Sequence, residues 1–181
     1  MAFLHSHTIV YRDLKPHNIL IFSLSLGTLI NAKISDFGSS RHATPSGFIA
    51  SEGTPGYRAP EVVRGDVVYN EKVDIFSLGM LLYELTTDGK QPFNDLKFRS
   101  ELDEAVVSGR PLDPIVVTGS PPWPDMQDLL DHMLEAEPEK RPTADQVRTR
   151  KKRTTCCKFS TGVNSIVVHP VNNVVNKVVQ P

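Results

Sequence analysis

Residues 9–22 read IVYRDLKPHNILIF: two apolar runs enclose a short segment with an arginine, an aspartate, a lysine and an asparagine. Apolar flanks anchor such a segment in a core, while the loop between them stays near water and presents polar groups from a rigid scaffold. The pattern therefore predicts a loop that positions catalytic groups. A plain polar turn between two strands is the alternative that this stretch alone leaves open.

The composition is that of an ordinary soluble domain. A chain of 181 residues has room for one domain with a sizeable core. The formal net charge of −1 and the 39% hydrophobic content predict no nucleic-acid partner. No apolar run approaches the roughly 20 residues that span a bilayer, and the two adjacent cysteines, Cys156 and Cys157, are interpreted as free thiols. We expect a cytoplasmic protein without a membrane span.

Strands are expected only near the start of the chain. The β-favouring runs 19–22 and 32–34 predict an antiparallel hairpin. Residues 38–60 are rich in Ser, Thr, Gly and Pro and show little periodicity, which is typical of a regulatory loop.

Residues 60 to about 150 are predicted to be helical. Residues 71–89 contain apolar side chains on all sides, which indicates a helix buried in the core, with Asn70 as its cap. Apolar residues recur on one face over 96–108, and again over 125–137 before Pro138. The sequence therefore predicts a mainly α fold with a short β-hairpin.

The end of the chain has a different character. Thr143 and Gln146 predict a capping box for a last helix that begins near Ala144. The basic cluster at 150–153 is interpreted as a solvated helix end, with a nuclear signal as the alternative. Residues 151–181 have no predicted structure and form either a tail or the start of a following domain.

Four polar residues suit phosphoryl transfer. Such a reaction needs an acceptor for a hydroxyl proton, cations that neutralise the transferred group, and ligands that hold those cations. Asp13 offers the acceptor and Lys15 a mobile cation, while Asn18 and Asp36 offer oxygen ligands for a hard divalent ion.

Three motifs, YRDLKPHN at 11–18, DFG at 36–38 and APE at 59–61, resemble in order and spacing those of the protein kinases. The resemblance implies the large, C-terminal lobe of a kinase, ATP and Mg²⁺ as cofactors, and a protein substrate. It assigns catalysis to Asp13 and Lys15, nucleotide contact to Lys15, and metal ligation to Asn18 and Asp36. The lysine marks the serine/threonine class.

Four further residues match supporting positions of the kinases. Asp74 resembles the aspartate that accepts hydrogen bonds from the catalytic-loop backbone, although an exposed position on an imperfectly buried helix is the alternative. Arg141 resembles the arginine that pairs with the glutamate of APE, here Glu61. Arg12 resembles the arginine that receives a phosphate from the activation segment.

Residues 8–148 resemble more closely the leucine-rich repeat kinases of the Roco group, through SLSLGTLINAK, EGTPGYRAPEVVRG and PPWP. These relatives share Tyr11 in place of the usual histidine, whereas Phe37 stands where they commonly have tyrosine. The resemblance implies a GTPase domain in the same longer chain as a partner.

The activation segment, Asp36 to Glu61, contains several hydroxyls. Ser51 is the first choice for a regulatory phosphate, which could dock on Arg12, whereas Thr54 is expected to contact Lys15 and the catalytic loop. For any single hydroxyl here, a solvated loop residue is the alternative.

A kinase binds ATP between two lobes, yet no Gly-rich loop and no paired lysine and glutamate precede residue 9. We therefore expect residues 1–150 to form a large lobe without the small lobe, followed by residues 151–181. On this interpretation the chain belongs to a longer serine/threonine kinase and is by itself inactive. A non-catalytic kinase-like module that binds protein partners is the alternative.

Overall fold

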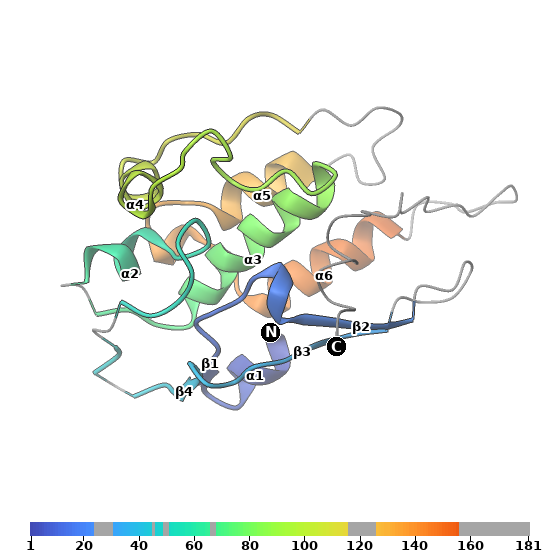
Figure 1. The fold of residues 1–181 in the computed structure, drawn as a ribbon. Helices are drawn as coiled ribbons and strands as arrows, with labels where there is room; N and C mark the ends of the chain where they lie inside the picture. The colour runs from blue at the N-terminus through green and yellow to red at the C-terminus, as the bar shows by residue number, and fades with distance from the viewer. Residues whose placement is uncertain (24–30, 45, 49–50, 66–67, 116–125, 156–181) are drawn as a thin grey trace, which may run out of the picture.

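The computed structural model describes residues 1–23, 31–44, 46–48, 51–65, 68–115 and 126–155. Helices dominate these ranges, and the strands form two small sheets of two strands each, which confirms the mainly α expectation (Figure 1). No helix within these ranges is long and apolar enough to cross a membrane. The predictions for the two cysteines and for most of the tail lie outside the described residues.

Helix α3, Lys72–Thr86, passes through the middle of the molecule (Figure 1). Its buried side chains include Val73, Ile75 and Phe76, so it is the core helix that its all-round apolar pattern predicts. The residue that directly precedes the helix is Glu71, one position after the predicted cap; Asn70 Oδ1 still accepts a hydrogen bond of 3.0 Å from the backbone nitrogen of Lys72.

Within the described ranges five further α-helices lie around α3. They are α1 (Ala2–Ser6), α2 (Pro60–Arg64), α4 (Arg99–Val107), α5 (Met126–Met133) and α6 (Ala144–Thr155), with short 3₁₀ turns at Pro16–Asn18 and Pro138–Lys140. Helix α3 packs against α5, α2 against α4, and α1 against α6.

The close packing of α3 on α5 depends on a glycine. A Cβ atom added to Gly79 would lie 2.8 Å from Leu134 Cδ2 and 3.2 Å from Met133 Cβ. Because real Cβ atoms do not approach neighbours this closely, only glycine lets the two helices meet at this distance.

The helix ends differ from the predicted ones where local bonding overrides the apolar pattern. Helix α4 begins at Arg99, and Phe98 immediately precedes it with two thirds of its surface exposed. There Glu101 Oε2 accepts a hydrogen bond of 3.0 Å from the backbone nitrogen of Phe98 and fixes the start of the helix.

The last helix begins where its cap predicts. Gln146 Oε1 accepts 2.7 Å from the backbone nitrogen of Thr143, and Thr143 Oγ1 accepts 3.2 Å from that of Gln146. These reciprocal bonds form the expected capping box. Helix α6 then continues past residue 150 to Thr155.

The two sheets hold the ends of the 11–18 loop, which we call the polar loop. Strand β2 (Ile19–Ser23) pairs antiparallel with β3 (Asn31–Ile34), as predicted, while β1 (Ile9–Val10) pairs with β4 (Arg41–His42), which the sequence did not indicate. The polar loop thus leaves β1 and enters β2 through the 3₁₀ turn. Both of its ends are fixed by strand pairing.

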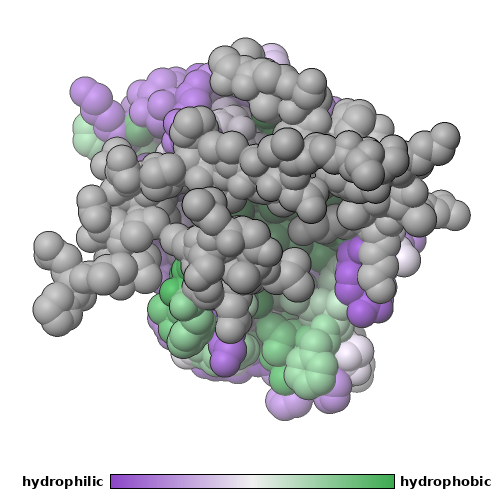
Figure 2. Space-filling model, turned by 90° about the vertical axis from the view of Figure 1, so that its right-hand side faces the viewer, coloured by the Kyte–Doolittle hydropathy of each residue, from purple (hydrophilic) through white to green (hydrophobic). Residues whose placement is uncertain are grey.

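Strand β2 also presents apolar side chains to solvent. Leu20, Ile21 and Phe22 are exposed, with Phe22 the most accessible of the three. Figure 2 views the molecule from the right-hand side of Figure 1 and shows hydrophobic residues gathered in the lower part of that face.

Candidate active site

The side chain of Asp74, near the start of α3, anchors the polar loop by binding backbone nitrogens of the loop. Its side chain is fully buried; Oδ2 accepts a hydrogen bond of 2.8 Å from the nitrogen of Tyr11, and Oδ1 one of 2.7 Å from that of Arg12. These contacts are the ones that the resemblance predicts, and they exclude the exposed alternative. Charge-assisted bonds of this kind compensate a buried carboxylate for its lost hydration.

Asp74 also contacts a histidine, and this contact could not be predicted from the sequence. His5 Nε2, on α1, lies 2.9 Å from Asp74 Oδ2. The carboxylate therefore joins α1, the polar loop and α3 at one buried point.

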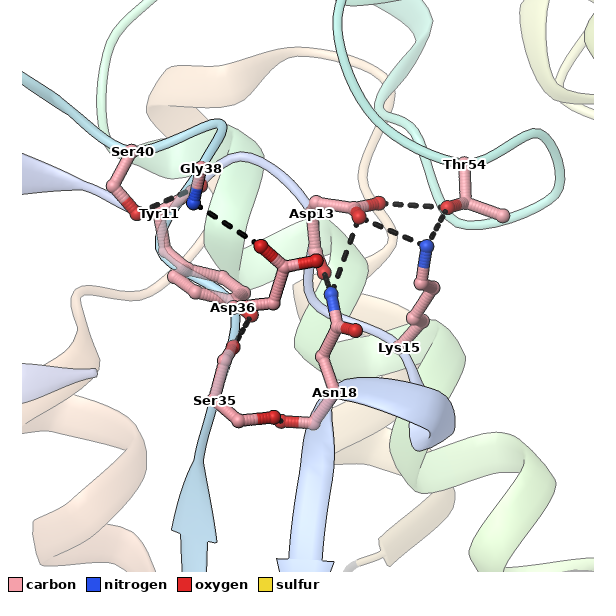
Figure 3. Close-up of polar contacts among 9 residues, drawn as sticks. All are labelled: Tyr11, Asp13, Lys15, Asn18, Ser35, Asp36, Gly38, Ser40 and Thr54. Carbon is pink, nitrogen blue, oxygen red and sulfur yellow. Dashed lines mark hydrogen bonds and ion pairs between the residues drawn. The ribbon is translucent and has the colours of Figure 1, made fainter. Parts of the chain in front are cut away.

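Three polar side chains converge on Asp13 (Figure 3). Thr54 Oγ1 donates 2.6 Å to Asp13 Oδ1, while Lys15 Nζ and Asn18 Nδ2 donate to Oδ2 at 2.9 and 3.2 Å. Asn18 Nδ2 also donates 2.9 Å to the backbone oxygen of Asp13. These donors fix the orientation of the carboxylate.

Thr54 reaches this cluster from the distant 36–61 segment. Its hydroxyl accepts 2.7 Å from Lys15 Nζ, the contact expected of it. The approach requires Gly53, whose φ is 98° and where a Cβ atom would lie 2.6 Å from the backbone oxygen of Arg12. Sequence reasoning missed the role of Gly53, because close approach of two loops leaves no local pattern.

Asp36 follows β3 in a left-handed conformation, with φ of 55°. Its Oδ1 accepts 3.2 Å from the nitrogen of Gly38, and the side chain lies on the same side as Asp13 and Asn18 (Figure 3). A non-glycine residue in this conformation is held there by its surroundings, and such strain is common where function constrains the backbone.

Tyr11 connects the polar loop with the DFG turn. Its hydroxyl donates to the backbone oxygen of Ser35, and its ring meets Phe37 edge-on at 5.4 Å between centroids. Burial raises the pKa of Tyr11 to about 12, so the hydroxyl keeps its proton and remains a donor at neutral pH.

Asn18 and Asp36 fit a hard divalent cation by their chemistry. An amide oxygen and a carboxylate are ligands that Mg²⁺ accepts, and the ion takes its remaining ligands from phosphates and water. Since Asn18 uses its Nδ2 toward Asp13, its Oδ1 is the atom left for a metal. Within the described ranges no cluster of three or more His, Cys, Asp or Glu residues forms a metal site.

Glu61 and Arg141 form the expected ion pair. Arg141 Nη1 and Nη2 lie 2.6 and 2.8 Å from the two carboxylate oxygens of Glu61, and both side chains are almost fully buried. Arg141 also donates to the backbone oxygens of Lys72, Glu135 and Ala136. The fork–fork pair fastens α2, at the end of the 36–61 segment, to the helical body.

In its unmodified form Ser51 contacts Arg58. Its exposed hydroxyl accepts 2.9 Å from Arg58 Nη1, and Arg58 Nη2 forms a two-oxygen contact with Asp103 on α4 at 2.7 and 2.6 Å. Arg12 instead donates 2.6 Å to the backbone oxygen of Ser39. These contacts are those of the unmodified hydroxyl, and the docking of a Ser51 phosphate on Arg12 stays a prediction.

A buried pair that was not predicted joins the 36–61 segment to α3. The Tyr57 hydroxyl donates to Glu84 Oε2, and both side chains are buried. Burial raises the pKa of both groups, because each ionised form would lose its hydration.

Comparison with known proteins agrees with the geometry. The family model for the protein kinase domain matches residues 1–151. The chain is 41% identical over 165 residues to leucine-rich repeat serine/threonine-protein kinase 1 of Mus musculus, covering 88% of this chain. It is also 41% identical over 158 residues to the protein of the same name in Caenorhabditis elegans, covering 81% of this chain.

A more distant relative is calcium/calmodulin-dependent protein kinase type II of Caenorhabditis elegans, 38% identical over 151 residues and 81% of this chain. The chain spans 8%, 6% and 20% of the length of these three relatives. All three relatives are protein kinases by name, in agreement with the family model. The chain therefore belongs to the protein kinase family.

Proposed function

We propose that this chain supplies the catalytic half of an ATP-dependent protein serine/threonine kinase. The observation that carries the proposal is the convergence of Thr54, Lys15 and Asn18 on the carboxylate of Asp13. Those contacts bring together a proton acceptor, a mobile cation and a metal ligand, the groups that phosphoryl transfer requires.

Asp13 is the proposed proton acceptor. Its carboxylate is half-buried and held by three donors, so it keeps a fixed direction for a substrate hydroxyl. A serine or threonine hydroxyl of a protein would approach between Asp13 and the residues around Thr54. Because Lys15 bridges Asp13 and Thr54, it would bring positive charge close to the group that is transferred.

Asn18 and Asp36 are the proposed ligands for Mg²⁺. When bound, Mg²⁺–ATP supplies the phosphoryl group and the cation that neutralises its developing charge. Asn18 directly precedes β2 and Asp36 follows β3, so the positions of both rest on the hairpin between them. Arg12, Asp74, Glu61 and Arg141 support these groups by their backbone and ion-pair contacts.

The domain arrangement and partners belong to the same proposal. Residues 1–150 would form the large lobe of the kinase, and residues 151–181 a separate tail or the start of another domain. A GTPase domain in the same polypeptide is the proposed regulatory partner. Ser51, beside Arg58, and Thr54 are the proposed phosphorylation sites, with Thr54 the less accessible because its hydroxyl already contacts Asp13.

The test is transfer of the γ-phosphate from Mg²⁺–ATP to a protein substrate by the native polypeptide that carries this sequence. Asp13→Asn keeps the size of the side chain but removes the proton acceptor, so we expect transfer to fall by at least about a hundredfold. Acid hydrolysis of the product should yield phosphoserine or phosphothreonine. Chelation of divalent metal should stop the reaction, and added Mg²⁺ should restore it.

Asp95→Asn is the matched control, because Asp95 is an exposed aspartate whose partner is Arg110. Activity should not change in this variant. Equal activity in Asp13→Asn and wild type would refute the assignment of Asp13. Absence of transfer in the wild type, together with retained binding of a protein partner, would favour the non-catalytic module.

A further inference from the structure

Arg12 lies in a pocket of uncharged groups. Its side chain is 7% exposed; Nε donates 2.6 Å to the backbone oxygen of Ser39, and Nη1 donates 3.3 Å to the hydroxyl of Tyr69. The guanidinium carbon lies 5.2 Å from the centroid of the Phe48 ring, within the range of a cation–π interaction. Among the described residues no carboxylate forms an ion pair with Arg12.

Phe48 and Tyr69 are held together as a unit, which we call the aromatic clamp. Their backbones form a two-way antiparallel bridge, with N–O distances of 3.2 and 3.1 Å, and their ring centroids are 5.5 Å apart. Gly47 makes the pairing possible: its φ is 65°, and a Cβ atom there would lie 2.2 Å from Val68 Cγ1.

The clamp joins the 36–61 segment to the polar loop. Phe48 lies in the segment, Tyr69 lies between α2 and α3, and Arg12 directly precedes Asp13. The backbone of Arg12 has a φ of 73° and donates to Asp74, so its position also sets the position of Asp13. A displaced Arg12 side chain would release one of the contacts that hold this strained residue in place.

We propose that Phe48 and Tyr69 are positioning residues, which hold Arg12 and thereby the polar loop in place without a phosphate on the 36–61 segment. The expected effect of these residues on activity rests on the proposed kinase function, whereas their expected effect on the position of the polar loop does not. A phosphate would need access to the guanidinium, which is buried and covered on one face by Phe48. Two neutral acceptors, the Ser39 carbonyl and the Tyr69 hydroxyl, and a ring face satisfy the charge instead.

Phe48→Leu tests the ring itself, because leucine keeps apolar bulk but has no π face. In the native polypeptide we expect kcat to fall about tenfold with the KM for ATP within about twofold, since Arg12 acts through Asp13 and not on the nucleotide. Phe48→Tyr restores the ring face and should recover wild-type kcat. Phe98→Leu, the same change at an exposed phenylalanine, is the matched control.

Amide hydrogen exchange of residues 10–13 gives a readout that does not depend on activity. Exchange there should be about tenfold faster in Phe48→Leu, and unchanged in Phe48→Tyr, in Phe98→Leu and in the wild type after phosphatase treatment. Unchanged protection in Phe48→Leu would overturn the proposal, as would faster exchange at residues 10–13 on dephosphorylation of the wild type. A wild type without phosphotransfer would refute the proposed function, while the exchange experiment would still decide the role of the clamp.

Discussion

Replacing Arg141 by methionine is the most direct test of how the helical body holds the 36–61 segment. Methionine fills much of the same volume but removes all the donors, so the Glu61 carboxylate, 2% exposed, would stay buried without a partner. The backbone oxygens of Lys72, Glu135 and Ala136 would lose their donor as well.

Breaking one side of a buried ion pair costs about 3–5 kcal/mol in the free energy of unfolding. For a domain of this size each kcal/mol lowers Tm by roughly 2–4 °C. The expected fall in Tm is therefore about 6–20 °C. Arg141→Lys should cost nearly as much, because one ammonium group cannot form two parallel bonds to Glu61 and also reach the carbonyl groups.

Urea unfolding followed by circular dichroism measures this cost. The variants are Arg141→Met, Glu61→Gln and the double variant, which together give the coupling energy of the pair. Removing both charges relieves the unpaired carboxylate, so the double variant should be more stable than the sum of the single effects by about 2 kcal/mol. Arg148→Met, which breaks the exposed pair with Asp145, is the control and should leave the midpoint unchanged.

An Arg141→Met variant that loses less than about 1 kcal/mol would refute the expected cost, since the buried carboxylate would then have been compensated in another way. Additive single effects in the double variant would equally contradict a direct pair. A large loss in Arg148→Met would show that the measurement does not separate buried from exposed pairs.

Three other variants test separate features. Gly53→Ala would force a Cβ atom to within 2.6 Å of a backbone oxygen of the polar loop, so kcat should fall roughly a hundredfold while circular dichroism stays native; unchanged kcat would exclude a role for this contact. In Gly79→Ala the new Cβ atom would lie 2.8 Å from Leu134 Cδ2, so the variant should lose about 1–3 kcal/mol in urea unfolding; an unchanged midpoint would contradict tight packing of α3 on α5. Glu84→Gln tests the raised pKa of Glu84. Burial makes the folded state hold the proton of Glu84 more tightly than the unfolded state does. Protonation of Glu84 therefore contributes to stability below its ordinary pKa of 4.5, and this contribution is lost as the pH rises. The variant should therefore unfold at a higher temperature than wild type at pH 7, with the gap closing below pH 4.5; a gap independent of pH would contradict burial as the cause.

Elements with a local signal could be predicted from the sequence. The capping box of Thr143 and Gln146, the core helix 72–86 and the pairing of β2 with β3 follow from periodicity and neighbouring residues, and the structure contains all three. The pairing of β1 with β4 could not be predicted, because strands of two residues have no measurable period. The apolar pattern over 96–108 placed Phe98 inside a helix, whereas Phe98 directly precedes α4. The spacing of apolar residues does not show at which residue the helical hydrogen bonds begin.

The contacts of the site likewise fall into those that the sequence predicts and those that it does not. Clustered polar residues identified the polar loop, and the resemblance supplied the partners of Asp74 and Glu61, which lie more than sixty residues away in sequence. Single long-range contacts outside known motifs had no signal. His5 beside Asp74, and Arg58 between Ser51 and Asp103, are pairs that only the folded chain brings together.

Asp74 accepts hydrogen bonds from the main-chain nitrogens of Tyr11 and Arg12, and these two bonds do not involve the side chains of those residues. Positions 11 and 12 are therefore free to change their chemistry without losing this anchor, and a tyrosine can stand where other kinases have histidine. Proline is the exception, because it has no N–H to donate. A saturation library at these two positions, sorted for folded protein, should be depleted first of proline, because proline is the residue type that this anchor excludes.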